Sequence, residues 1–136
     1  MEEPIDFQDI TITFDKIDKD PSHDEKLLYS FILSPTPTDD WRRLFLEQSW
    51  PRRQEFAPDI DASFLGANIL IIKCYETRIE KDIDDGARQA VSTANMYYRD
   101  LVQQINAKRV RDEGEKQRRE SERERLIKEK TARLKS

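Results

Sequence analysis

Three groups of side chains in the sequence could bind a metal ion or take part in catalysis. The first surrounds His23, the single histidine, which lies close to Asp20 and Asp24 in a polar segment. These side chains could ligate a metal weakly, but a specific site needs three or four converging ligands. We therefore expect a solvated loop here and no metal site.

The second group is acidic and consists of Asp82, Asp84 and Asp85, which follow an apolar segment. Such a cluster would suit a small metal-dependent hydrolase or nuclease. Acidic side chains also stabilise the start of a helix, because they oppose the positive end of the helix dipole. We favour this second interpretation and keep the hydrolase as an alternative.

Cys74 is the only cysteine, so the chain cannot form an internal disulfide or a multi-cysteine zinc site. It lies in an apolar segment, where a thiol behaves as a small apolar side chain. The glycines, Gly66, Gly86 and Gly114, are too far apart to form a phosphate-binding loop. The sequence therefore predicts no catalytic residue, no cofactor and no metal site, and we expect the protein not to be an enzyme.

These residues are positioned by a core centred on the stretch from Asn68 to Ile105. Its first part begins with the apolar run Ile69–Tyr75, and its β-branched residues predict a buried strand over Ile69–Glu76. Its second part has apolar residues at intervals of three and four, the period of a helix. These residues are Ile83, Ala87, Ala90, Ala94, Tyr98, Leu101 and Ile105. The helix begins either at the capping-box segment Thr77–Glu80 or at the later acidic cluster.

Two strands are expected before this stretch. Ile10, Ile12 and Phe14 alternate with polar residues, which predicts a first strand with one buried face. Residues 27–33 predict a second strand that is central and covered on both faces. Residues 60–65 are either a further strand, which turns into the next one through residues 66–68, or irregular.

A short helix is expected between these strands. Thr38 is suited to cap it, and two acidic residues follow in its first turn. We expect the helix to span residues 39–48 and to end before Pro51, because the residue preceding a proline disfavours helical geometry. Residues 52–58 would then form a loop. The expected buried face comprises Trp41, Leu44 and Phe45, with Gln48 as a further candidate.

Together these elements predict an α+β fold. It would contain a small sheet of three to four strands, one short helix, and one long C-terminal helix that protrudes as a charged extension. A right-handed crossover through the short helix would make the sheet mixed. The order of the strands cannot be read from the sequence.

The charges divide the chain near Ile105. Residues 1–105 contain 12 basic and 21 acidic residues, whereas residues 106–136 contain 12 basic and 7 acidic residues. The only sizeable apolar side chains in the second part are Val110, Leu126, Ile127 and Leu134, so no apolar heptad continues there. We expect a compact domain over residues 1–106 and a charged extension, helical or partly disordered, over residues 107–136.

Two segments are candidates for partner binding. Trp50, Arg52 and Arg53 place an aromatic ring and two guanidinium groups in an expected loop, a composition enriched at interfaces. The alternative for Trp50 is packing in the core. Near the C-terminal end, Leu126 and Leu134 align on one side of a helix with Ile127 beside them. We expect this end to dock into a groove or against another copy.

The sequence therefore favours a non-catalytic protein–protein interaction module, such as an adaptor, accessory subunit or inhibitor, which binds another protein or forms an oligomer with itself. The first alternative is a nucleic-acid-associated protein that binds through the basic tail, although acidic residues are interleaved with the basic ones there. The second alternative is the hydrolase described above.

The expected location is intracellular. No segment has the roughly 18 consecutive apolar residues of a membrane span. The first four residues have neither the basic nor the apolar region of a signal peptide. These features predict a soluble, cytoplasmic protein that does not bind membranes.

Overall fold

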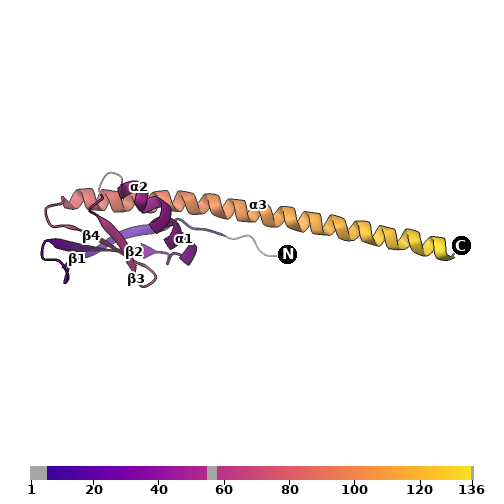
Figure 1. Ribbon diagram of the computed structural model, residues 1–136, viewed down its shortest axis with the longest axis horizontal. Coiled ribbons are helices and arrows are strands. Elements are labelled where there is room, and N and C mark those ends of the chain that lie inside the picture. Colours follow the sequence, from indigo (N-terminus) through magenta and orange to yellow (C-terminus); the bar gives the residue numbers. More distant parts are fainter. Residues whose placement is uncertain (1–5, 55–57, 136) are drawn as a thin grey trace. The chain divides into compact units, whose positions relative to one another are not determined.

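The structure is a computed structural model that describes residues 6–54 and 58–135, apart from the side chains of residues 53 and 54. In this part of the chain the strands are β1 (Thr11–Lys19), β2 (Lys26–Ser34), β3 (Asp61–Leu65) and β4 (Ile69–Tyr75). The helical elements are α1 (Asp39–Leu44), the π-helix η1 (Phe45–Ser49), α2 (Trp50–Gln54) and α3 (Glu80–Lys135) (Figure 1). This confirms the predicted α+β fold with a long C-terminal helix.

The chain divides into two compact units between Asp100 and Leu101, so that α3 contributes to both. The sheet, α1, η1, α2 and the first part of α3 belong to the unit Phe7–Asp100. The boundary that we expect near residue 106 stays a prediction.

The four strands form one antiparallel sheet in the order β1-β2-β4-β3. The right-handed crossover that would make the sheet mixed does not occur, because β3 and β4 form a hairpin and β4 pairs antiparallel with β2. Gly66 allows the tight hairpin turn, since its φ of 66° is unfavourable for residues with a side chain. The pair Leu65–Ile69 closes the hairpin.

One face of the sheet carries the core. Every second residue of β4 is buried, and the same alternation continues in β3 with half-buried residues. The strand residues that are at most 4% exposed on this face are Tyr29, Phe31, Leu33, Leu70, Ile72 and Cys74. In Figure 1, α2 and the first part of α3 lie along one side of the sheet. The same core contains Trp41 of α1, Phe45 of η1, Trp50 of α2 and the apolar residues of α3.

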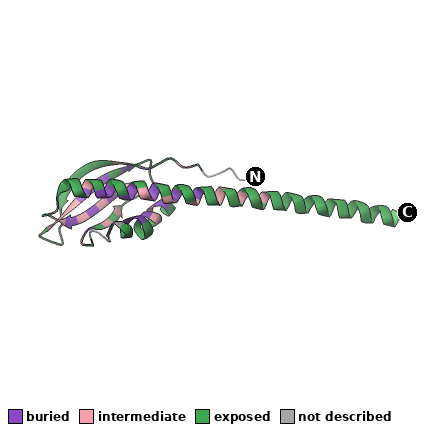
Figure 2. Cartoon of the chain, turned by 90° about the horizontal axis from the view of Figure 1, so that it is seen from above, coloured by how far each residue is buried: buried purple, intermediate pink, exposed green. Residues whose placement is uncertain are grey.

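The stripe predicted along α3 is confirmed for most of its length. Ile83, Ala87, Ala90, Ala94 and Tyr98 are all buried. Leu101 and Ile105 are only half-buried, and Val91 and Val102 are buried in addition. Buried positions are concentrated in the first half of the helix, and residues 114–135 are all exposed (Figure 2).

The short helix differs from the prediction. Thr38 caps it as expected, because its hydroxyl accepts the backbone N–H of Trp41 at 3.2 Å. The helical segment does not end before Pro51. It continues from α1 through η1 into α2, and Pro51 lies in the first turn of α2, where a proline is tolerated. The buried face is Trp41, Phe45 and Ser49, whereas Leu44 is half-buried and Gln48 is exposed.

Two expectations about the strands are also corrected. Phe14 of β1 packs edge-to-face on Phe31 but remains 45% exposed, because β1 is an edge strand of the sheet that the described residues form. A bulge at Asp15 then shifts the register, so that Ile17 and not Lys16 follows Phe14 on the core side. β2 is central, as predicted, but it is not covered on both faces, since Ile32 is 39% exposed.

Replacing Ala94 by Asp tests this packing. Ala94 is 0% exposed, so an aspartate there would bury a charge without a partner. We expect a loss of about 3 kcal/mol or more in the free energy of unfolding, and a fall of about 12 °C or more in the melting temperature. Met96→Asp is the matched control, because Met96 is 49% exposed on the same helix. Similar melting curves for the two variants, measured by circular dichroism, would show that the stripe is wrongly assigned.

Candidate interaction surfaces

A buried amide joins the segments around the core. The side-chain oxygen of Asn95, on α3, accepts the backbone N–H of Ile10 at 2.9 Å and the indole N–H of Trp41 at 3.0 Å. Its amide nitrogen donates to the carbonyl of Ile10 at 2.9 Å. Asn95 is 8% exposed, and it thereby attaches α3 to both α1 and the start of β1. The apolar periodicity of the sequence contains no signal for this residue.

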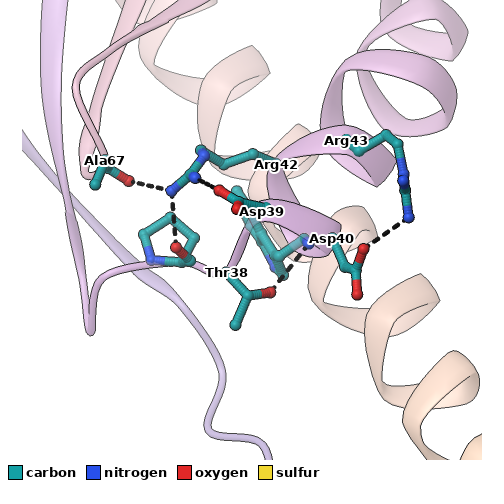
Figure 3. A network of polar contacts seen from close by, with 8 residues as sticks. Thr38, Asp39, Asp40, Arg42, Arg43 and Ala67 are labelled. Carbon is teal, nitrogen blue, oxygen red and sulfur yellow. Dashed lines mark hydrogen bonds and ion pairs between the residues drawn. The ribbon is translucent and has the colours of Figure 1, made fainter.

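A second polar network attaches α1 to the β3–β4 turn (Figure 3). One terminal nitrogen of Arg42 donates to the carbonyls of Pro37 and Ala67, each at 2.9 Å. Its other terminal nitrogen pairs with Asp39 in the first turn of α1. Arg43 forms a separate ion pair with Asp40 at 2.7 Å. The contacts of Arg42 hold α1 against this turn, whereas the Arg43–Asp40 pair lies within α1.

The predicted aromatic and basic segment lies in a helix, not in a loop. Trp50 is 5% exposed and its ring stacks on Phe45, with 6.0 Å between centroids, so it offers little surface to a partner. Arg52 is exposed and donates to the hydroxyl of Tyr97 at 3.1 Å, which connects α2 to α3. The side chain of Arg53 lies outside the described part of the structure. A role of these residues in partner binding stays a prediction.

The residues around His23 form a turn. Asp20 is buried and accepts the backbone N–H and the hydroxyl of Ser22, at 3.0 and 2.8 Å. These hydrogen bonds, and Lys73 at 3.4 Å, lower the pKa of Asp20. His23 accepts the backbone N–H of Glu25 at 3.2 Å, and its ring packs against Tyr75.

The acidic cluster lies in the first turns of α3, which begins at Glu80. Asp84 forms an ion pair with Arg88 at 3.0 Å, while Asp82 and Asp85 are exposed. No group of three or more metal-ligating side chains occurs within residues 6–54 and 58–135. The hydrolase alternative therefore gains no support from the geometry.

Cys74 is 0% exposed, and burial raises the pKa of its thiol. A raised pKa disfavours the thiolate, the form that acts as a nucleophile. The thiol therefore has the properties of a core side chain.

The surface that sequence reasoning missed is the second face of the sheet, because the strand β2 was expected to be covered there. Aliphatic residues from three adjacent strands lie on this open face: Leu28, Ile32, Leu65, Ile69 and Ile71. Ile32 and Leu65 both pair with Ile69, so the three side chains form a row across the sheet. Leu65 is 63% exposed and Ile32 is 39% exposed.

Charge is distributed unevenly over the open face. The row of Leu65, Ile69 and Ile32 continues to Thr13 of β1 and contains no charged side chain. The second row beyond it contains three charged side chains and one leucine. Its paired residues are Asp61, Lys73, Leu28 and Asp18. The face therefore has an uncharged, mainly aliphatic half and a charged half.

The predicted docking residues on α3 are exposed. Leu126, Ile127 and Leu134 are 45%, 64% and 88% exposed. Val110 is 58% exposed. None of these side chains belongs to the core, so their large apolar groups are accessible to a partner. No helix in the described part of the chain is long and apolar enough to cross a membrane.

Comparisons of the chain with protein-family models, with curated proteins and with solved structures find no match.

An ion pair next to the sheet makes stability depend on pH. Arg78 donates to both carboxylate oxygens of Asp59, and these hydrogen bonds lower the pKa of Asp59. A carboxylate with a lowered pKa stabilises the folded state above its unfolded pKa of about 3.9, and this contribution disappears as the pH falls through the folded value.

We therefore expect Asp59→Asn to lower the melting temperature at pH 7 and to have a smaller effect at low pH. The control is Asp85→Asn, because Asp85 is exposed and forms no ion pair within the described residues. The measurement is the melting temperature of each variant and of the unaltered chain between pH 7 and pH 2.5. An equal difference between Asp59→Asn and the unaltered chain at every pH would contradict this account of the ion pair.

Proposed function

We propose that the chain is a non-catalytic protein–protein interaction module, in which the open face of the sheet binds a protein partner. The observation that carries this proposal is the aliphatic row Leu65, Ile69 and Ile32, in which Leu65 and Ile32 are exposed and Ile69 between them is half-buried. Clustered exposed apolar side chains are typical of binding sites, whereas single ones are common on any surface. A non-catalytic role also agrees with the structural contacts of the arginines and acidic residues described above.

The charges on the open face indicate the chemistry of the partner. A surface that covers the row from Leu65 to Thr13 meets aliphatic and hydroxyl groups, so it must be apolar and uncharged there. A charged partner group over this row would lose its hydration without gaining an ion pair. The other half is charged: Lys73 pairs with Asp20 at 3.4 Å and Asp18 pairs with Lys16 at 3.3 Å. Charged pairs at the edge of a contact influence the orientation of a partner more than its affinity.

A second docking point belongs to the same proposal. Leu126, Ile127 and Leu134 present apolar side chains near the end of α3. They are few, so their contribution to affinity is modest and becomes important when the open face is bound simultaneously. The proposal describes an adaptor, accessory subunit or inhibitor, and it places the chain in the cytoplasm.

The open face is tested by Ile32→Lys, with Ile17→Lys as the matched control. The two isoleucines have similar exposures, 39% and 43%, and lie on neighbouring strands, but Ile17 is on the core side of the sheet. Proteins captured by the immobilised intact chain are identified, purified and titrated against both variants. We expect Ile32→Lys to weaken binding about tenfold or more, whereas Ile17→Lys leaves it unchanged.

Two outcomes would contradict the proposal. Equal binding by both variants would show that the open face is not the contact. Steeply salt-dependent binding of DNA or RNA by the intact chain, without any protein partner, would favour the nucleic-acid alternative.

A further inference from the structure

The exposed part of α3 has a regular charge pattern. Between residues 108 and 125 the uncharged residues are Val110, Gly114, Gln117 and Ser121. Together with Ala107 they follow one another at intervals of 3, 4, 3 and 4, the spacing of the a and d positions in a coiled coil. All five are exposed. They form an uncharged seam along one side of the helix.

Opposite charges flank this seam. With Ala107, Gly114 and Ser121 at a, the g positions hold Glu113 and Glu120. The e positions hold arginines: Arg111, Arg118 and Arg125. One flank is therefore acidic and the other basic. This order is unusual in a segment whose charges are otherwise interleaved.

The flanking charges complement a second copy of the same helix in one orientation. In a parallel pair, a g residue faces the e residue five positions later in the partner helix. Glu113 then faces the partner's Arg118, and Glu120 faces the partner's Arg125. Two-fold symmetry doubles both pairs. In an antiparallel pair g faces g and e faces e, which would bring like charges together.

These side chains have few competing contacts within their own chain. Among the described residues, Glu113, Arg118 and Glu120 form no ion pair. Arg125 has only a long contact of 3.9 Å with Glu129, and its side chain is 72% exposed. The charges that a parallel pair requires are therefore available to a second chain.

We propose that two copies pair as parallel helices along the uncharged seam of residues 107–121, with Glu113 and Glu120 of each chain bound to Arg118 and Arg125 of the other. The small side chains Ala107, Gly114 and Ser121 let the helices approach closely. Val110 is the one sizeable apolar group in the seam, so association is weak and depends on concentration. Salt weakens it, because the ion pairs are solvent-exposed.

This pairing does not depend on the open face of the sheet. The seam is on α3 and the open face is on the sheet. A variant that abolishes pairing of the helices can therefore still bind a partner through the open face, and the reverse also holds. Two paired chains would present two open faces, and a partner with two copies of its own binding surface would then bind more tightly.

Charge reversal tests the pairing in the intact chain. The variant Glu113→Arg/Glu120→Arg has arginine on both flanks, and the variant Arg118→Glu/Arg125→Glu has mostly glutamate on both. We expect each variant alone to associate at least about tenfold more weakly than the unaltered chain. An equimolar mixture of the two should associate again, because each flank then meets an opposite charge. The measurement is sedimentation equilibrium over a wide concentration range at two salt concentrations.

The matched control is Glu115→Arg/Glu122→Arg, which has the same composition as the first variant but changes residues on the outer side of the helix. It should associate like the unaltered chain, and circular dichroism should show equal helix content in all variants. The pairing is overturned if the unaltered chain stays monomeric at every concentration, if the seam variants associate normally, or if their mixture does not associate.

A crosslinking experiment tests the orientation of the two helices. For parallel helices we expect the variant Ser121→Cys to crosslink to itself under mild oxidation. Crosslinking only between the variants Ala107→Cys and Ser121→Cys would show the antiparallel arrangement.

Discussion

The hydrogen bonds of Asn95 determine how the elements of the first unit fit together. Its amide satisfies both backbone groups of Ile10 and the indole of Trp41, at distances of 2.9 to 3.0 Å. A polar group in a core is stable only when its hydrogen bonds are made, so this side chain requires one arrangement of α3, α1 and the start of β1. An apolar side chain of similar size would fill the space without imposing that arrangement.

The position of the helices leaves the other face of the sheet uncovered. Trp41, Phe45 and the buried residues of α3 occupy the side of the sheet where Phe31, Leu70 and Ile72 lie. No described element places a buried aromatic ring on the side of Ile32 and Ile71. A four-stranded antiparallel sheet is stable with one face exposed, but that face is then usually polar. The aliphatic row on this sheet departs from that pattern, and this departure is the basis for proposing that a protein partner covers it.

Much of the fold is predictable from local patterns. The alternation at Ile12 and Phe14, the β-branched run of β4 and the spacing of Ile83 to Tyr98 all correspond to elements of the structure. Thr38 was recognisable as a cap because its chemistry is local. The continuation of the helical segment through Pro51 could not be recognised from the sequence, because it depends on the π-helix η1, which packs Phe45 and Ser49 inward.

The candidate surfaces were harder to predict. A strand with apolar residues on both sides, such as β2, looks fully buried in sequence, and only the tertiary arrangement shows that one side has no cover. Asn95 was missed because a search for apolar periodicity ignores polar core residues. The seam of α3 was missed because Val110 is its one sizeable apolar residue. The heptad spacing is recognisable only from the positions of the uncharged residues between Lys108 and Arg125.

The central claim is that this chain has a core that is complete in itself and separate exposed features that bind other chains. Hydrogen exchange of the intact protein, measured by mass spectrometry in dilute and concentrated solution, tests it most directly. The account predicts that amides of β2, β4 and residues 80–100 are protected at both concentrations, whereas amides of residues 107–121 gain protection only on concentration. Protection of β2 and β4 that appears only in concentrated solution would contradict it, and so would exchange of residues 107–121 that is equally fast at both concentrations.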